Sequence, residues 1–112
     1  MTIFEKIAAK QIPAKIVFET EDLVAFRDAN PQAPVHVLIV PRRPIARIGV
    51  AGDLDAELLG DLLLAARKVA QIEGVAESGY RLVINNGADA GESVPHLHVH
   101  LLGGRALAWP PG

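Results

Sequence analysis

Residues 93–104 read SVPHLHVHLLGG and hold three of the chain's four histidines, His96, His98 and His100. A single aliphatic residue separates each histidine from the next. Because side chains alternate between the two faces of a β-strand, this spacing predicts a strand with three imidazoles on one face and aliphatic side chains on the other. We expect the aliphatic face to join the core and the imidazoles to line a site.

The rest of the chain is patterned as an α+β fold, with a five-stranded antiparallel sheet, one long helix and one short helix. Thr2 and Glu5 form a capping box, which predicts a short helix that stops before Pro13. Asp53 is the expected N-cap of the long helix, which ends near Gly74. The expected strands, mostly joined as a meander, are residues 14–19, 23–28, 35–42, 80–86 and 96–102. Apolar residues recur along the long helix at spacings of three and four: Leu54, Leu58, Leu62, Ala65 and Val69, with Leu59, Leu63 and Ala66 beside them.

Composition limits the class of protein. The chain has 112 residues, a net charge of −2, no cysteine and 50% hydrophobic residues. We expect a single domain over residues 1–112, with no disulfide framework and no basic face for nucleic-acid binding. No apolar run approaches the roughly 18 residues that span a bilayer, so we expect no membrane association and a cytoplasmic location. The high apolar content favours a subunit interface.

Three interpretations of the clustered imidazoles follow from the residues alone. Three unrelated surface histidines would require a coincidence of spacing. A metal site is the second interpretation, but His96 and His100 start about 13 Å apart on a strand, too far to share one ion. One ion would therefore take two of the three, plus His36 or a carboxylate such as Asp89 or Glu92.

The third interpretation is phosphoryl-transfer chemistry. The segment NNGADAGES, residues 85–93, supplies flexible backbone N–H groups that can surround an anion just before the histidines. Neutral imidazole is a competent nucleophile near its reference pKa of about 6.5. One histidine could attack phosphorus while its neighbour on the same face contacts the phosphate oxygens.

HLHVHLL matches the His-x-His-x-His-x-x pattern, with x hydrophobic, of the histidine triad (HIT) family. The segments TIFEKI, IPAKIVFE, AFRDANPQAP, YRLVINNG, GESVPHLHVHLLGGR and WPPG extend the resemblance over nearly the whole chain. They resemble the Hint branch of histidine triad nucleotide-binding proteins, which are purine nucleoside phosphoramidases. The resemblance implies a HIT-like fold, a homodimer and a C-terminal tail at residues 104–112.

The resemblance also implies roles for individual residues. His98 would be the nucleophile that takes the nucleoside monophosphate, and His100 would contact the phosphate and assist the leaving amine. His96 and His36 would orient that pair, and Trp109 on the tail would influence substrate choice. The remaining nucleotide-binding positions would be Asn85, Gly91, Ser93 and the Val94 amide at the phosphate, Asp28 at the ribose, and Ile3, Phe4, Ile7, Phe26 and Leu38 around the purine. The substrate would be of the AMP or GMP type, and no metal or cofactor is implied.

Periodicity alone would make Phe4, Ile7, Phe26 and Leu38 ordinary core residues. The chain also departs from many Hint relatives at Ala29, Pro44 and Pro95. Dinucleoside polyphosphate hydrolases of the Fhit type lack the WPPG ending, and the galactose-1-phosphate type of nucleotidyltransferase has glutamine where this chain has His100. A nucleotide-binding module whose catalysis is incidental remains the alternative from a different class.

Overall fold

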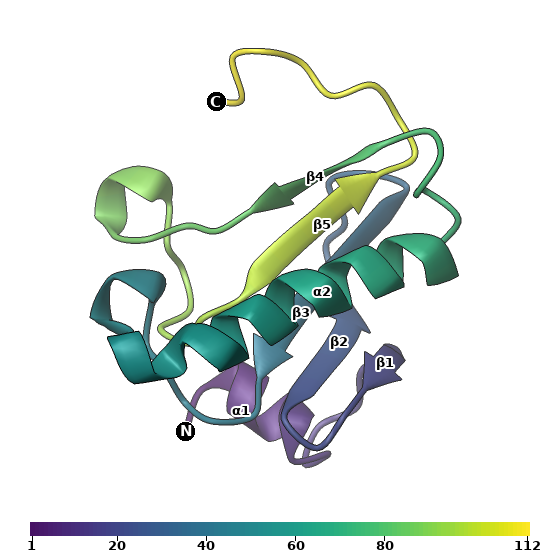
Figure 1. The fold of residues 1–112 in the computed structure, drawn as a ribbon. Coiled ribbons are helices and arrows are strands. Elements are labelled where there is room, and N and C mark those ends of the chain that lie inside the picture. Colours follow the sequence, from purple (N-terminus) through teal and green to yellow (C-terminus); the bar gives the residue numbers. More distant parts are fainter.

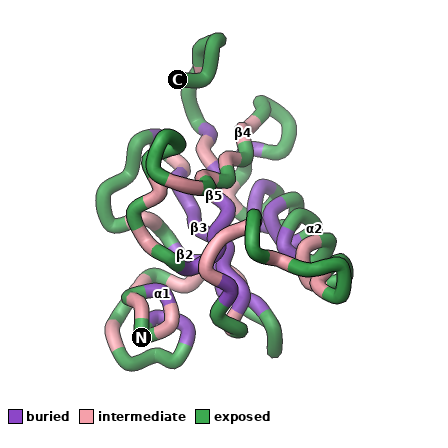
Figure 2. Tube along the Cα trace, turned by 90° about the vertical axis from the view of Figure 1, so that its left-hand side faces the viewer, coloured by how far each residue is buried: buried purple, intermediate pink, exposed green.

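The computed structural model describes residues 1–112, which form an antiparallel sheet with one helix on each face (Figures 1 and 2). The expected α+β fold, with five strands, one long helix and one short helix, is confirmed. The strands are β1 (Ile16–Glu19), β2 (Leu23–Arg27), β3 (Val35–Pro41), β4 (Tyr80–Val83) and β5 (Val99–Gly103). The helices are α1 (Ile3–Ala8) and α2 (Ala56–Ile72), with 3₁₀ turns η1 (Ile48–Val50), η2 (Asp53–Asp55) and η3 (Ala88–Ala90).

The strand order is β1-β2-β3-β5-β4. The first three strands form the expected meander, but β5 pairs between β3 and β4, so α2 carries the chain from a central strand to the sheet edge. In the β3–β5 register, Leu38 lies opposite His100 and His36 lies opposite Leu102. Because opposed residues of an antiparallel pair share a face, this register places His36 and His100 diagonally on one side of the sheet.

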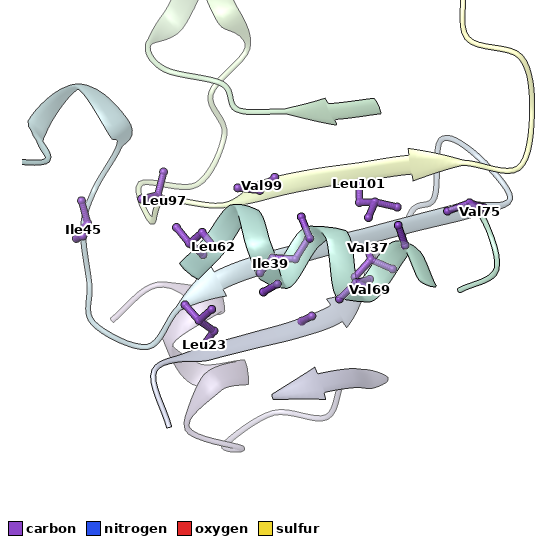
Figure 3. Packing of buried hydrophobic residues seen from close by; sticks show 14 residues of the cluster. Leu23, Val37, Ile39, Ile45, Leu62, Val69, Val75, Leu97, Val99 and Leu101 are labelled. Carbon is purple, nitrogen blue, oxygen red and sulfur yellow. The ribbon is translucent and has the colours of Figure 1, made fainter. Parts of the chain in front are cut away.

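The larger core cluster lies between α2 and the sheet (Figure 3). Leu62 and Val69 of α2 belong to the same buried cluster as Val37, Ile39 and Leu101 of the two central strands. Val99 and Leu101 thus point toward α2, as the alternation of the histidine segment predicts. Figure 2 shows the buried parts of β2, β3 and β5 between the two helices.

A smaller core cluster lies on the opposite face, beneath α1. It consists of Phe4, Ile7, Ala8, Val24, Phe26, Leu38 and Val40. The helix above it begins at the predicted capping box. The Glu5 N–H donates to Thr2 Oγ1 and the Thr2 N–H donates to Glu5 Oε1, both at 3.2 Å. The first turn of α1 is therefore held by its own residues, and its apolar side closes over the sheet.

The predicted start of the long helix is wrong by two residues. Asp53 begins the 3₁₀ turn η2, and α2 starts at Ala56 with Asp55 at the N-cap position. The Asp55 carboxylate accepts from the Gly52 N–H at 2.8 Å and from Arg43. Leu54 is fully exposed. It lies before α2 begins, so the helical spacing does not direct its side chain toward the core. Leu63 is also half-exposed, which narrows the buried stripe.

The prediction that all three clustered histidines lie on one strand is wrong for two of them, since β5 begins only at Val99. His96 and His98 precede the strand in a bent segment, where the His96 N–H donates to the Val94 carbonyl at 2.8 Å. Pro95, which lies inside this turn, has no N–H for a strand ladder. β4 likewise ends at Val83, three residues short of the expected boundary. Neither helix has the length and apolar character needed to cross a bilayer.

Candidate active site

The four histidines meet on the α1 side of the sheet, brought there by three segments. His36 comes from β3, His100 from β5, and His96 and His98 from the bend before β5. The ring centroids of His98 and His100 are 4.9 Å apart, and those of His36 and His100 are 5.2 Å apart. The Phe4 ring meets the His98 ring edge-on at 4.9 Å, which closes the cluster from the α1 side.

The hydrogen bonds of His36 determine which nitrogen of His100 carries a proton. The Gln32 N–H donates to His36 Nδ1 at 3.0 Å, so this nitrogen is unprotonated. The proton of neutral His36 is therefore on Nε2, which lies 2.9 Å from His100 Nδ1 and donates to it. Because His100 Nδ1 accepts, the proton of neutral His100 is on Nε2, the nitrogen left free to donate to a ligand.

A backbone carbonyl fixes the tautomer of His98 in the opposite sense. His98 Nδ1 lies 2.7 Å from the His96 carbonyl oxygen, which can only accept, so Nδ1 carries the proton. His98 Nε2 then has a free lone pair. His96 is fully buried, and its Nε2–H donates to the Pro41 carbonyl at 2.7 Å, while its Nδ1 has no partner. The four imidazoles thus present one nucleophilic nitrogen, on His98, beside one N–H donor, on His100.

Burial favours the neutral forms of His36 and His100. The pKa of His100 is lowered to about 4, mainly by burial and also by His98 and His36, against the opposing effect of Asp28. Burial also lowers the pKa of His36, against the opposing effect of Asp28, whose Oδ2 lies 3.4 Å from His36 Nε2. A neutral His100 at pH 7 acts as a hydrogen-bond donor through Nε2–H and carries no positive charge.

A cavity of about 640 Å³ lies between α1 and the start of the β2–β3 loop. Two residues of its lining connect it to the histidines: Phe4 contacts His98, and Asp28 contacts His36. All six residues expected around the purine and the ribose line it: Ile3, Phe4, Ile7, Phe26, Asp28 and Leu38. The structure therefore brings the expected purine and ribose positions together in one cavity. It adds residues that the sequence reasoning missed, among them Ile12, Ala14 and Pro31, which carry no motif that could have revealed them.

The expected phosphate-binding residues lie in the loop between β4 and β5, and they differ in their contacts and exposure. Gly91 has φ +80°, a left-handed conformation that explains a glycine there. Val94 packs against the cluster beneath α1. The side chains of Asn85 and Ser93 make no hydrogen bond within the chain, and Ser93 is exposed. Asn86, which the sequence did not indicate as a site residue, accepts a hydrogen bond from the Gly49 N–H through its Oδ1 at 2.7 Å.

Sequence reasoning also missed an ion pair in this loop. Glu92 accepts from Arg47 Nε at 2.8 Å and from Arg47 Nη2 at 3.0 Å. The sequence carried no signal for the pair, because the partners are 45 residues apart. Neither carboxylate considered as a metal ligand groups with the imidazoles in a metal-binding arrangement. Glu92 forms an ion pair with Arg47, and Asp89 lies exposed in η3.

The one group that could hold a metal ion uses a different carboxylate. Single ligand atoms of Asp28, His36 and His100 lie within 4.8 Å of one another. Two imidazoles and a carboxylate are a donor set that zinc accepts. In this chain, however, the two imidazoles are hydrogen-bonded to each other, so a metal would have to replace that bond.

The tail at residues 104–112 has no regular structure and projects beyond the β4 edge of the sheet (Figures 1 and 2). Arg81 Nη2 donates to the Ala108 carbonyl at 2.9 Å, and the neighbouring Trp109 is 81% exposed. Within one chain, therefore, the tail does not bring Trp109 into the histidine cluster.

The model of the HIT domain matches residues 9–107. The chain is similar to the 14 kDa zinc-binding protein of Zea mays, with 52% identity over 113 residues that cover 99% of this chain and 88% of that protein. Among solved structures, a HIT family hydrolase from Legionella pneumophila Philadelphia 1 has a TM-score of 0.97 and 52% identity, covering both chains completely. The histidine triad nucleotide-binding protein from Candida albicans has a TM-score of 0.83 and 31% identity, covering 98% of this chain and 83% of that one.

Proposed function

The chain belongs to the HIT domain family, and from this membership and its site we propose that it hydrolyses the P–N bond of purine nucleoside phosphoramidates. The observation that carries the proposal is the free lone pair on His98 Nε2 beside the N–H donor of His100. The Legionella relative is named a hydrolase and the Candida relative a nucleotide-binding protein, which supports a hydrolase that acts on nucleotides. The assignment to the Hint branch is part of the proposal, with adenosine 5′-phosphoramidates as the candidate substrates. Aminoacyl-adenylates are further candidates, from which the same attack would break a P–O bond and release a carboxylate in place of an amine.

In the first step, His98 Nε2 attacks the α-phosphorus as the P–N bond to the amine breaks. The new P–Nε2 bond leaves the imidazole positively charged, with its Nδ1–H held by the His96 carbonyl. The leaving nitrogen takes up one proton from solvent, to which the water of the second step returns one, and departs as an amine. His100 Nε2–H stabilises the charge on the phosphate oxygens or the leaving nitrogen by hydrogen bonding.

In the second step, water attacks phosphorus and the P–Nε2 bond breaks, which releases the nucleoside monophosphate. The water loses one proton, which balances the proton taken up by the amine. His98 regains its Nε2 lone pair without changing its Nδ1–H bond. The same tautomer therefore serves both steps, and no rearrangement of the imidazoles is needed between turnovers.

The cavity beside the histidines is the proposed nucleoside site. Its volume of about 640 Å³ and its largely apolar walls suit a purine, and Asp28 is the carboxylate placed to accept from ribose hydroxyls. The peptide N–H groups of the loop around Gly91 and Val94 would surround the phosphate. Residues 1–112 would act as one HIT domain whose tail modulates the leaving-group site.

We also propose a homodimer formed by α2 and β4. β4 is an edge strand whose partner on one side is missing, and Leu82 is 36% exposed there, with Ile84 39% exposed just beyond it. On α2, Leu63 and Leu64 are about half-exposed. A second copy of the chain would remove these apolar side chains from water and pair the free backbone N–H and C=O groups of β4.

The test is turnover of adenosine 5′-phosphoramidate, lysyl-adenylate and diadenosine polyphosphates, compared by kcat/KM in the presence of a metal chelator. Release of AMP from adenosine 5′-phosphoramidate, with the polyphosphates at least about a hundredfold slower, supports the proposal; release from lysyl-adenylate would extend the activity to the P–O bond of an acyl phosphate. Activity that disappears with the chelator and returns with zinc contradicts it, as does a preference for the polyphosphates.

Zinc binding is the second candidate function, favoured by the Asp28, His36 and His100 group and by the name of the maize relative. Titration calorimetry with ZnCl₂ on wild-type protein and on Asp28→Asn would test it. A zinc affinity that falls in Asp28→Asn would support this second function.

A further inference from the structure

Three hydrogen-bonded connections attach residues 45–49 to the loop between β4 and β5. The Leu97 N–H donates to the Ile45 carbonyl at 2.6 Å, and the Gly49 N–H donates to Asn86 at 2.7 Å. Between them, the guanidinium of Arg47 binds the carboxylate of Glu92 through two hydrogen bonds. Residues 45–49 therefore run along the loop and hold it at both ends and at its middle.

Glu92 also closes the loop on itself. Its Oε1 accepts from the Gly87 N–H at 3.0 Å, and its own N–H donates to the Gly87 carbonyl at 3.2 Å. Residues 87–92 thus form a closed turn whose two ends are joined by the backbone and the side chain of Glu92. Gly91 and Ser93, the neighbours of Glu92 in the chain, are the residues proposed to contact the phosphate.

A negative charge at Glu92 is unfavourable beside an anionic ligand unless it is neutralised. The side chain of Glu92 is 12% exposed and that of Arg47 is 34% exposed, so water screens the pair incompletely. The Arg47 hydrogen bonds and the Gly87 N–H lower the pKa of Glu92 to about 2, so its carboxylate is ionised at neutral pH. Arg47 supplies the opposite charge at contact distance through a bidentate arrangement.

We infer that Arg47 is a positioning residue for nucleotide binding: it cancels the charge of the Glu92 carboxylate next to the phosphate. This inference rests on the proposed function, since it assumes that the loop binds the phosphate of a nucleotide. Arg47 touches neither substrate nor histidine in this arrangement. It acts through Glu92, so its effect falls on binding of the phosphate more than on the nucleophile.

The experiment compares wild type with Arg47→Gln, Glu92→Gln and the double variant R47Q/E92Q. It measures the Kd for AMP by calorimetry, kcat and KM for adenosine 5′-phosphoramidate, and Tm. Arg47→Gln leaves Glu92 charged and unneutralised, and should raise the AMP Kd and KM at least about tenfold, with kcat changed less than about threefold. Glu92→Gln keeps an oxygen acceptor for Gly87 and removes the charge, so its Kd should stay within about threefold of wild type. R47Q/E92Q, which carries no charge, should return to within about threefold.

Arg43→Gln is the matched control. It breaks the ion pair of Arg43 with Asp55 at the start of α2, away from the loop, and should leave the AMP Kd unchanged. If Arg47→Gln does not fold, Arg47→Lys takes its place, because lysine keeps the charge without the bidentate geometry; its Kd should stay within about threefold.

The inference is overturned if Glu92→Gln weakens AMP binding as much as Arg47→Gln, since both would then act only by loosening the loop. It is also overturned if R47Q/E92Q fails to recover, if Arg47→Lys loses tenfold, or if wild type does not bind AMP. Wild type that binds AMP without hydrolysing the phosphoramidate would overturn the proposed activity alone, because the Kd comparison needs no turnover.

Discussion

His36 and His100 are joined by a hydrogen bond of 2.9 Å between Nε2 and Nδ1, across the two central strands of the sheet. The Gln32 N–H on the other side of His36 sets the direction of this bond. A residue 64 positions away in the sequence thus decides which nitrogen of His100 can donate to a ligand.

Replacing His36 should change catalysis through His100. His36→Leu removes the donor to His100 Nδ1, which frees His100 to place its proton on that nitrogen and lose the Nε2–H donor. We expect kcat/KM to fall at least about tenfold. His36→Gln retains an N–H donor of similar reach and should recover most of the activity. Equal losses in both variants, measured by steady-state kinetics, would show that His36 serves packing only.

His98 should be the residue that carries the nucleotide. His98→Ala should abolish turnover of adenosine 5′-phosphoramidate, because its Nε2 is the free lone pair of the cluster. His100→Gln should slow turnover by about 10²–10³-fold, the usual cost of losing one donor to a developing oxyanion, while the nucleophile remains. Mass spectrometry of acid-quenched wild-type reactions should locate the nucleotide on His98. Its detection on His96 or His100 would contradict the assignment.

Stability should fall as the pH is lowered from about 6.5 toward 4. The pKa of His100 is about 4 in the folded chain and near 6.5 when unfolded, so between these values the unfolded chain binds more protons. The lowered pKa of His36 acts in the same direction. Urea unfolding at pH 7 and pH 5 should therefore show a smaller decrease in His100→Gln than in wild type. Parallel decreases in the two proteins would mean that His100 is not responsible.

The proposed dimer predicts a sedimentation mass near twice 11.9 kDa at micromolar concentration. Leu82→Arg, which places a charge on the exposed edge strand, should shift that mass toward the monomer, because the arginine would be buried without a partner. Glu77→Arg, an exposed change before β4, is the control. A wild-type mass near 11.9 kDa at micromolar concentration would reject the dimer.

Trp109 should influence which leaving groups are accepted. Deleting residues 108–112 should leave dimerisation and AMP binding largely intact, because in one chain the indole is 81% exposed and no site residue depends on it. The deletion should change kcat/KM unequally for phosphoramidates with a small amine and with a bulky aromatic amine. An equal change for both substrates would make the tail a structural strap.

Local sequence determined the parts of this protein that depend on neighbouring residues. The period of two around Val99 and Leu101 directed those side chains to the α2 face, and the capping box at Thr2 and Glu5 began α1 where expected. Such patterns act within a few residues, where backbone geometry fixes the direction of each side chain. The prediction was wrong at Asp53 and Leu54, which lie in a 3₁₀ turn before α2 and not in the helix.

The chemistry of the histidines was decided only by tertiary structure. The sequence placed three imidazoles close together, but the β3–β5 register brought in His36, and the carbonyl of His96 selected the free nitrogen of His98. Tautomers and pKa values depend on hydrogen-bond partners and burial contributed by segments far apart in the chain. Arg47 reached Glu92 for the same reason, across 45 residues, which no spacing rule relates. Pairing at such a distance is specified by the packing of the whole chain, because only folding brings these groups together and removes water from around them.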